Sequence, residues 1–340
     1  MAAIRLQDVA AHAGVSMKTV SNVVHNYPHV SETMRAKVQK AIDELGYRPN
    51  ALGRRLATGH TGMLALAFSF VTIPYFAELA QVMTDEARKR GYRLLLEQTN
   101  NTLEGERAIV STEEAGLVDG LIFQPAQMSP VELARHRGDV PLVLLGEGPA
   151  PVGFDHVMID NIAAADAVTS HLIALGRRRI AFVGHEEGAL AETSRQRLAG
   201  YQQALHRAGI PLDAQLLIAS RTVSSHDSAE AVGHALDRRV SFDAIVSRDD
   251  LAAIGALRAL QERGFSVPGD VALTGWDAIP VGAFTHPSLT TVQADMHALA
   301  VVALDMLEER ISGYDGIGRH RLVDFELVIR ESAPAVSAVS

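Results

Sequence analysis

The sequence predicts a small all-α N-terminal unit and a large α/β unit made of two doubly wound parallel-sheet lobes. Three short helical patterns follow one another before residue 47, and from Met63 onward short apolar runs alternate with amphipathic stretches. Such alternation is typical of parallel sheets with helices on both faces. The 340 residues, 47% of them hydrophobic, are enough for one small and one large folded unit.

The composition excludes several classes of protein. The chain has no cysteine, so disulfides and thiolate metal sites cannot contribute. It shows no apolar N-terminal stretch of the signal-peptide kind, and its apolar runs are shorter than the ~18 residues of a membrane span. We therefore expect a cytoplasmic protein with no membrane partner.

The formal charge is unevenly distributed. The whole chain carries −9, but residues 1–60 hold eight Lys and Arg against four Asp and Glu, a balance of +4. The remainder holds 23 basic and 36 acidic residues, a balance of −13. A basic head on an acidic body is consistent with a polyanion-binding domain attached to a self-repelling body.

A short break joins the first two helical patterns. The dipeptide Gly14-Val15 ends the first pattern, and Ser16 can cap the second. The apolar positions at helical spacing are Leu6, Val9, Ala10, Ala13, Val20, Val23 and Val24. A tight turn at Gly14 lets two helices cross steeply, so that the second can lie in the major groove of DNA.

The outward face of the second helix is suited to reading bases. It carries Met17, Lys18, Ser21, Asn22 and His25. Lysine can donate to guanine, asparagine can pair with adenine, and methionine can pack on a thymine methyl. The alternative is a small helical bundle with a solvated polar face, because helix-turn-helix shapes also occur outside DNA-binding proteins.

A third helix and a short linker follow. Ser31 predicts the N-cap of a helix that Gly46 ends. Asn50 can cap a further helix over residues 51–57, but isolated helices below ~12 residues are marginal, so it needs a partner to fold. We therefore expect a DNA-binding domain at 1–49, a hinge at 50–60 and a core at 61–340. The alternative for the hinge is a plain interdomain linker.

Apolar runs in the core predict strands, and amphipathic stretches between them predict helices. The runs are residues 63–70, 92–99, 120–126, 141–147, 180–185, 244–248 and 271–277. The stretches include residues 76–90, 161–175, 195–208 and 249–263. The number of units indicates two sheets, with a break near residues 156–160.

Polar residues follow several of the predicted strands. In open parallel sheets ligands bind beyond the carboxyl ends of the strands. The candidates at these ends are Ser69, Phe70, Gln124, Glu147, His185, Arg248, Asp249 and Asp277. This mixture suits a carbohydrate or another polyhydroxyl ligand. The alternative for each residue is a plain surface position.

The N-terminal segments resemble the headpiece and hinge of the LacI/GalR family of repressors. The matching features, with the gaps between them, are Asp8-Val9-Ala10, Ala13-Gly14-Val15-Ser16, Thr19-Val20-Ser21, Val30-Ser31 and Tyr47-Arg48-Pro49-Asn50. By position the resemblance implies that Met17, Lys18 and Asn22 read bases and that Thr19, Ser21 and His29 contact phosphates. Many members carry Arg at the position of Asn22, so the operator half-site cannot be copied from a relative.

The same resemblance implies a DNA-binding role for the hinge. In the family this segment folds on DNA, and a leucine that matches Leu56 wedges into the central base step of the operator. Asn50 would cap the segment, and Arg54 lies beside the leucine in the sequence. We therefore expect Asn50, Arg54 and Leu56 at the DNA.

The resemblance extends over the core, which is similar to periplasmic sugar-binding proteins whose two lobes close on a ligand. The matching segments are Pro74-Tyr75-Phe76, Asp119-Gly120, Asp160-Asn161 and residues 175–180, 197–201 and 289–292. It implies further crossings between the lobes near residues 290 and 322. It also implies an effector cleft lined by Ser69, Tyr75, Phe76, Gln124, Arg195, Arg197 and Asp277.

Two features of the expected cleft depend on single positions. Sugar-responsive members use the earlier arginine and purine-responsive members the later one, and of the two we prefer Arg195. Arg248-Asp249 replaces a usual small residue and Asn, and Glu147 lies one residue after the Asp of many relatives. We keep Glu147 and Asp249 as effector candidates, with a differently substituted sugar or a non-sugar as the ligand.

An enzyme and a transport binding protein are the alternatives from other classes. Asp249 and Asp277 could serve a glycosidase. The sequence, however, has no nucleophile motif, phosphate-cradling loop or metal-spaced histidine set, so we expect no catalytic residue, no metal and no cofactor. A solute-binding protein would have an export signal and no DNA-reading head.

The sequence thus predicts a homodimeric repressor that a small sugar-type effector releases from a palindromic operator in double-stranded DNA. A corepressor-dependent regulator that binds a metabolite such as a purine is the alternative. The C-terminal residues 333–340 carry no leucine heptad of the kind that forms a tetramerising coiled coil.

Overall fold

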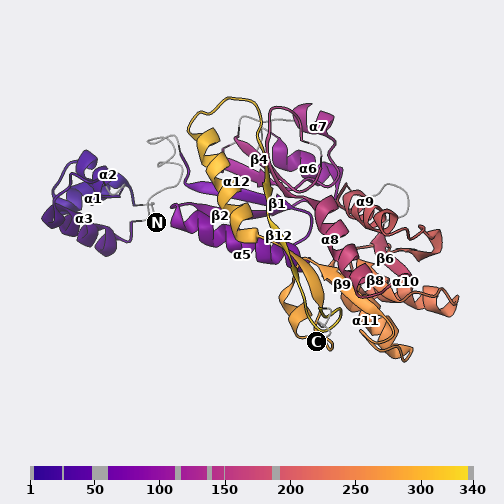
Figure 1. The fold of residues 1–340 in the computed structure, drawn as a ribbon. Helices are drawn as coiled ribbons and strands as arrows, with labels where there is room; N and C mark the ends of the chain where they lie inside the picture. The colour runs from indigo at the N-terminus through magenta and orange to yellow at the C-terminus, as the bar shows by residue number, and fades with distance from the viewer. Residues whose placement is uncertain are drawn as a thin grey trace. The chain divides into compact units, whose positions relative to one another are not determined.

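The computed structural model describes residues 4–24, 27–47, 60–111, 116–135, 140–148, 150–185 and 192–335. The chain divides into two compact units, Met1–Thr61 and Gly62–Ser340. Figure 1 shows helices in the first unit and sheets flanked by helices in the second. The expected hinge, residues 50–60, lies outside the described residues except for His60.

The N-terminal unit contains three helices, α1 (Leu6–Ala13), α2 (Met17–Val24) and α3 (Glu32–Leu45). Val9, Val20 and Val38, one from each helix, are fully buried against one another in its core. In α1 and α2 the buried residues all belong to the apolar positions that the sequence predicts at helical spacing.

Local chemistry sets the helix ends in this unit. Gly14 adopts a left-handed conformation with φ +59°, and the amide of Val15 donates to the carbonyl of Ala10 at 3.0 Å, which closes α1. Ser16 Oγ accepts from the amide of Thr19 at 3.1 Å, and Ser31 Oγ accepts from the amide of Met34 at 3.4 Å. The turn between α1 and α2 is therefore short and defined, as a helix-turn-helix requires.

The first lobe of the large unit is built on a parallel six-stranded sheet with the order β11-β5-β4-β3-β1-β2. Its strands are β1 (Met63–Phe68), β2 (Arg93–Gln98), β3 (Gly120–Phe123), β4 (Leu142–Leu145), β5 (Asp155–Ile159) and β11 (His320–Val323). Its helices are α5 (Pro74–Lys89), α6 (Leu103–Val110), α7 (Pro130–Arg135) and α12 (Met296–Ile311).

The second lobe repeats this arrangement with the order β12-β10-β9-β8-β6-β7, in which only β12 is antiparallel to its neighbour. Its strands are β6 (Ile180–His185), β7 (Leu217–Ala219), β8 (Ala244–Ser247), β9 (Ala272–Trp276), β10 (Thr290–Ala294) and β12 (Phe325–Val328). Its helices are α8 (Asn161–Ala174), α9 (Glu192–Arg207), α10 (Ser225–Asp237) and α11 (Asp250–Glu262), with 3₁₀ turns η2 (Ala214–Leu216) and η3 (Pro280–Ala283).

The described chain passes between the lobes at three places. After β5 it enters the second lobe at Asp160, whose carboxylate caps α8 at the amide of Ala163. After β10 it returns at Asp295, which caps α12 in the same way. Asp324 separates β11 in the first sheet from β12 in the second. The three segments lie at the junction of the lobes.

The predicted fold class is confirmed: an all-α helix-turn-helix unit precedes two doubly wound parallel-sheet lobes. In both sheets the strand order reverses beside the first strand of the lobe, β1 or β6. Ligands of such sheets bind where the order reverses, outside the carboxyl ends of the strands.

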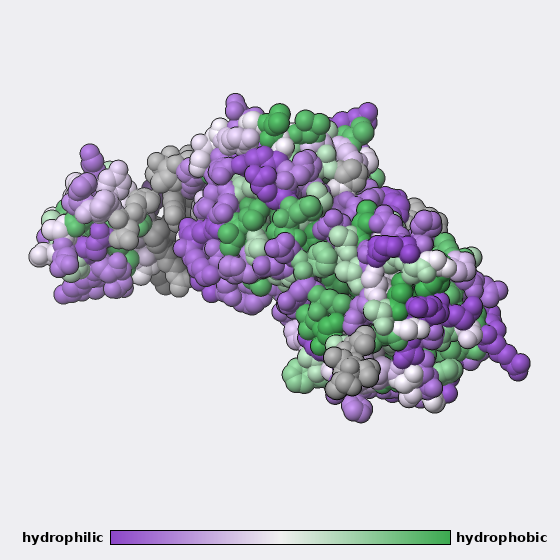
Figure 2. Space-filling model, viewed as in Figure 1, coloured by the Kyte–Doolittle hydropathy of each residue, from purple (hydrophilic) through white to green (hydrophobic). Residues whose placement is uncertain are grey.

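The surface of the large unit is mixed. Figure 2 shows hydrophilic side chains over much of the visible face, with smaller apolar areas between them. Among the described residues no helix is both long and apolar enough to cross a membrane.

Candidate functional site

The exposed face of α2 presents the residues expected to read DNA. Val20 and Val23 are buried, so the opposite side of this helix faces solvent. Met17 is 56% exposed and Lys18 is also exposed, whereas Asn22 is half-buried. Met17, Lys18 and Asn22 thus lie on a face from which methionine, lysine and asparagine can reach base edges.

The expected phosphate-contacting residues flank this face. The hydroxyl of Thr19 lies 2.9 Å from that of Ser16 at the start of α2, and Ser21 is half-buried further along the helix. His29 is exposed in the segment before α3, where Arg35 Nη2 donates to the carbonyl of Tyr27 at 3.0 Å. A helix start and an exposed imidazole are both suited to phosphate contacts. Asn50, Arg54 and Leu56 lie outside the described residues.

In the large unit a second polar group forms where the two lobes meet. We define the interlobe cluster as Tyr75, Glu147, Arg197, Asp249 and Asp277. Tyr75 and Glu147 belong to the first lobe and the other three to the second, and the charges of the cluster act on one another across the junction. The cluster draws on residues at or just beyond the ends of β4, β8 and β9, where a ligand of a doubly wound sheet is expected.

Arg197 is the buried centre of this cluster. It projects from α9, is 8% exposed, and its guanidinium carbon lies 4.0 Å from the centre of the Trp276 ring. Its Nε donates to Asn161 Oδ1 at 2.8 Å, and its Nη1 donates to the carbonyl of Arg248. Burial lowers the pKa of Arg197, while Asp277, Glu147 and Asp249 oppose that shift.

Asp277 lies directly after β9 in a left-handed backbone conformation, with φ +98°, and Ala278 follows at φ +53°. Its amide donates to the carbonyl of Val292 at 2.8 Å, but among the described residues no donor bonds to its carboxylate. Burial raises the pKa of Asp277 well above its ordinary value; Arg197 lowers it, and the carboxylates of Asp249, Asp250 and Glu147 raise it further. The carboxyl group of Asp277 therefore lies beside a buried cation without a hydrogen bond from the described residues.

Asp250 is a residue that the sequence analysis did not select. It is fully buried at the start of α11, and its carboxylate accepts from Thr291 Oγ1 at 2.7 Å and from the amide of Ile279 at 2.8 Å. A Cβ on Gly275 would lie 2.0 Å from Asp250 Oδ1, so only glycine fits there. Asp250 thus ties down the turn that carries Asp277. The signal in the sequence was a second carboxylate immediately after Asp249 at a strand end.

Both carboxylate oxygens of Asp249 accept hydrogen bonds from residues nearby in the sequence. Its Oδ1 caps α11 at the amide of Ala252, 2.7 Å away, and its Oδ2 accepts from Arg248 Nε at 2.8 Å. Arg248 Nη1 donates in turn to the carbonyl of Gly184 at 2.6 Å. Asp249 and Arg248 therefore form a local ion pair, and the charge of Asp249 also acts on Arg197.

Glu147 joins the two lobes. Its Oε2 accepts from Thr193 Oγ1 at 2.5 Å, and its carbonyl accepts from Gln196 Nε2 at 3.1 Å, both on α9. The preceding residue, Gly146, has φ +89°, and the ring of buried His156 donates to its carbonyl. The loop after β4 is thus hydrogen-bonded to His156 through the carbonyl of Gly146, and to the second lobe through Glu147.

The other expected cleft residues divide into two groups. Gln124 packs against Gly146, and its buried Oε1 has no hydrogen-bond partner among the described residues. Ser69 is half-buried directly after β1, and burial with the charges of Glu147 and Asp277 raises the pKa of Tyr75. Gln124 and Ser69 therefore lie at strand ends, and Tyr75 is part of the cluster.

Phe76 and Arg195 lie outside the interlobe cluster. Phe76 is buried in the core of the first lobe, where its ring stacks on that of Phe68. The ring centroids are 5.0 Å apart and the ring planes are inclined by 5°. Arg195 is exposed on α9 and pairs with Glu192 one turn earlier. On a helix, residues two apart point in different directions, so burial of Arg197 turns Arg195 outward. The arginine that the structure places in the cluster is Arg197 and not the preferred Arg195.

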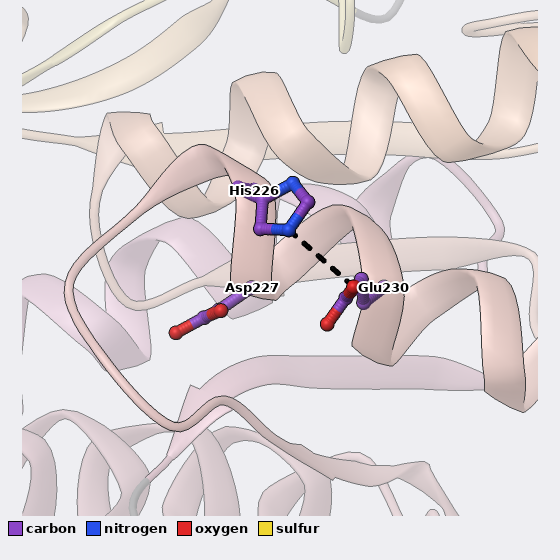
Figure 3. Close-up of side chains that lie close together, drawn as sticks. All are labelled: His226, Asp227 and Glu230. Atoms are coloured by element: carbon purple, nitrogen blue, oxygen red, sulfur yellow. Dashed lines mark ion pairs between the residues drawn. The ribbon is translucent and has the colours of Figure 1, made fainter.

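A group of metal-ligand type lies elsewhere, at the start of α10. Ligand atoms of His226, Asp227 and Glu230 are all within 4.8 Å of one another (Figure 3). Arg221 Nη2, however, donates to Asp227 at 3.0 Å and to Glu230 at 2.6 Å. A guanidinium therefore already occupies the carboxylates, and we assign no metal to this group.

A helix-turn-helix with an exposed polar second helix, followed by two lobes that meet at a buried polar cluster, defines a ligand-responsive DNA-binding regulator. Residues 5–50 match the family described as bacterial regulatory proteins, lacI family, and residues 169–333 match the periplasmic binding protein-like domain. The chain is 32% identical over 309 residues to catabolite control protein A of Priestia megaterium, covering 89% of this chain and 91% of that one. The chain belongs to the lacI family.

Solved structures agree with this assignment. One is the lac repressor dimer bound to operator and the anti-inducer ONPF, which is 26% identical to this chain. The match covers 98% of this chain and 100% of the repressor chain, with a TM-score of 0.85. The complex of the transcriptional regulator CelR with cellobiose is 28% identical, covers 97% and 99%, and has a TM-score of 0.71. The predicted family is confirmed, and its members are DNA-binding transcriptional regulators and not enzymes.

Proposed function

We propose that this protein is a homodimeric repressor that reads a pseudo-palindromic operator through α2 and is released by a sugar-type effector bound at the interlobe cluster. One observation carries the proposal: Arg197 is buried over Trp276 beside the carboxyl group of Asp277, which has no donor among the described residues, at the strand ends where the lobes meet. A guanidinium beside a carboxylate is suited to hydroxyl groups, which both donate and accept. The protein acts in the cytoplasm, where bacterial DNA lies.

The two-fold arrangement follows from the DNA. A pseudo-palindrome presents two equal half-sites, and a symmetric dimer places one helix-turn-helix on each. The lac repressor has been solved as a dimer on its operator, which supports the same assembly here. Met17, Lys18 and Asn22 then read bases, while Thr19, Ser21 and His29 contact phosphates. Asn50, Arg54 and Leu56 supply the hinge contacts to the minor groove.

The switch depends on contacts that join the lobes. Glu147 in the first lobe accepts hydrogen bonds from Thr193 and Gln196 in the second, so hydrogen bonds already join the two lobes at this point. An effector that bonds to both lobes adds to that contact and changes the population of closed cores. Closure alters the separation of the two hinges in the dimer, and the hinge segments then favour or disfavour DNA. The effector residues are Ser69, Tyr75, Gln124, Glu147, Arg197, Asp249 and Asp277.

A duplex selected from a random library by the purified protein provides the operator for the test. Operator affinity is then measured by fluorescence anisotropy with and without mono- and disaccharides, cellobiose included. We expect an effective sugar to weaken the wild-type complex. The variant Asp277→Ala should bind the duplex as the wild type does and no longer respond, whereas the control Glu104→Ala, at an exposed carboxylate on α6, should respond normally. Loss of operator binding in Asp277→Ala would contradict the site assignment.

A corepressor-dependent regulator that binds a purine is the second candidate. The burial of Arg197 in place of Arg195 favours it, because the later arginine is the one that purine-responsive members use. The two candidates differ in sign: a corepressor strengthens the complex with operator, and an inducer weakens it. Adding hypoxanthine and guanine to the same anisotropy measurement separates them.

A further inference from the structure

Glu106, a residue that the sequence analysis did not select, is a fully buried carboxylate on α6. Its Oε1 accepts from the amides of Ala126 at 2.7 Å and Gln127 at 3.0 Å. Its Oε2 accepts from the amides of Gln127 at 3.1 Å and Met128 at 2.7 Å. Consecutive backbone amides that converge on an anion form a nest. Here the anion is a side chain of the protein itself, so Glu106 fixes the backbone of residues 126–128.

Residues 126–128 belong to the loop that follows β3 and begins with Gln124. Ala126 and Gln127 are exposed, whereas Met128 is buried in the core of the first lobe. Exposed loop residues have few packing contacts to hold them, and their amides commonly bond to water. In this loop three consecutive amides bond instead to a buried carboxylate. The conformation of the loop therefore depends on Glu106.

The start of α6, which carries Glu106, is itself fixed against the end of β2. A Cβ on Gly105 would lie 2.2 Å from the carbonyl oxygen of Thr99, so only glycine permits this close approach. Thr99 is fully buried directly after β2. Gln127 Nε2 donates to Asn101 Oδ1 at 3.0 Å, which adds a second connection. The loops after β2 and β3 therefore form one connected unit, with Glu106 between them.

This unit contacts the loop that reaches the second lobe. A Cβ on Gly146 would lie 3.2 Å from Cγ of Gln124, so the loops after β3 and β4 pack directly against each other. The next residue, Glu147, accepts from Thr193 Oγ1 of the second lobe at 2.5 Å. A displacement of the loop after β3 would therefore move Gln124 and disturb the contact between the lobes.

We propose that Glu106 is a positioning residue for effector binding, which holds the loop after β3 in one conformation with and without the effector. This inference rests on the proposed function, because Gln124 is one of its effector residues. A loop that is already ordered loses no conformational freedom when a ligand binds, and this raises affinity. Glu106 itself makes no contact with the effector and acts through Gln124.

Hydrogen exchange of the ligand-free full chain tests whether Glu106 holds the loop. In Glu106→Gln one carboxylate oxygen becomes an NH₂ donor that cannot accept, so residues 126–128 should exchange about tenfold faster or more than in the wild type. Unchanged exchange of β3 checks that the lobe stays folded. Glu104→Gln, at an exposed position on the same helix, is the matched control and should exchange as the wild type does. Unprotected amides in the wild-type loop, or equal exchange in Glu106→Gln, overturn the proposal.

Titration calorimetry with glucose, galactose, cellobiose and hypoxanthine separates positioning from stability. For a compound that binds the wild type, Glu106→Gln should raise Kd about tenfold or more, because the loop must then be ordered on binding. Glu106→Asp keeps the carboxylate, so it should bind more tightly than Glu106→Gln, and it replaces that variant in both measurements if Glu106→Gln does not fold. Glu104→Gln should bind as the wild type does. A lowered Tm with an unchanged Kd overturns the proposal, since Glu106 would then act on stability alone.

Failure of this inference and failure of the proposed function give different results. A wild-type protein that binds none of the four compounds counts against the ligand classes of the proposed function, and hydrogen exchange then decides the role of Glu106 alone. A wild-type protein with no preference for any duplex over random competitor refutes the proposed function itself. Neither result changes the exchange expected of the loop after β3.

Discussion

At the scale of single residues, the carboxylates that follow β8 and β9 have different surroundings. Asp249 pairs with Arg248 and caps α11, whereas Asp277 lies beside buried Arg197 without a donor among the described residues. The sequence predicted Asp249 and Asp277 from their position after strands but could not distinguish these surroundings. That difference depends on which neighbour each carboxylate meets after folding. The orientation of Arg195 and Arg197 on one helix is decided in the same way.

Lys18 provides a prediction about sequence reading. Lys18→Ala should lower affinity for the selected operator by about 1–3 kcal/mol and relax the preference at one base pair, if this exposed side chain contacts a base. Competition binding with operators changed at each position measures the effect. Lys40→Ala serves as the control, because it removes the same charge from α3. The Nζ of Lys40 lies 3.8 Å from Oε1 of Glu44. An equal loss on all sequences would assign Lys18 to the phosphate backbone.

Asp250 provides a prediction about pH. Burial raises the pKa of Asp250 to about 7, although its bonds to Thr291 and Ile279 lower it. The folded protein therefore binds a proton between about pH 4 and 7 that the unfolded chain has released, so this group makes the free energy of unfolding fall as pH rises through that window. Asp250→Asn has no such proton, and its stability should fall less steeply between pH 4 and 7. Chemical denaturation at several pH values measures both slopes; parallel slopes would contradict the role of Asp250.

At the scale of elements, strongly apolar strands and clear turns were predicted, and weakly apolar ones were not. The runs around β1, β2, β3, β4, β6, β8 and β9 were all recognised, whereas β5 was missed because only the break between the sheets was expected near residues 156–160. β10 and the edge strands β11 and β12 mix polar with apolar residues, and β7 has only three. Their strand conformation depends on a neighbouring strand that sequence periodicity does not reveal. The hydroxyl caps at Ser16 and Ser31 could be recognised because they act locally.

Gly14 provides a prediction about the helix-turn-helix. Its φ of +59° is favourable for glycine, tolerated by asparagine and unfavourable for alanine. Gly14→Ala should destabilise the protein's N-terminal unit by about 1–2 kcal/mol, and Gly14→Asn by less. Circular dichroism of thermal unfolding, with operator affinity measured in parallel, checks the order of the two variants. Equal stability of the two would show that the turn does not require the left-handed conformation.

At the scale of the whole molecule, the regulator depends on coupling between a DNA-binding unit and a two-lobed core. The family resemblance predicted both parts and the class of function, because their motifs are local. It could not supply the buried oxygens of Gln124 and Ser247 that have no partner in the part of the chain that the structure describes, since an unpaired atom is a property of the folded interior. The contact of Glu147 with Thr193 across the junction was equally invisible in the sequence.

Thermodynamic linkage requires this coupling to be reciprocal. If an effector weakens operator binding by a given factor, saturating operator must weaken effector binding by the same factor, with a typical coupling of about 1–3 kcal/mol. Calorimetric titration of the effective sugar into the protein, alone and with its selected duplex, measures this factor. Thr193→Val removes the hydrogen bond to Glu147 and should reduce the coupling while operator affinity of the ligand-free protein stays within a few-fold. Unequal factors in the two directions would show that a third binding event is involved.

The return of the chain through both lobes near its C-terminus affects the order in which a newly made molecule becomes complete. One edge strand of each sheet, β11 or β12, lies between His320 and Val328, so neither sheet has all its strands until that segment has left the ribosome. The helices of the N-terminal unit are complete once Leu45 has been made. During synthesis, the part of the protein that recognises DNA is therefore finished long before the part that senses a metabolite.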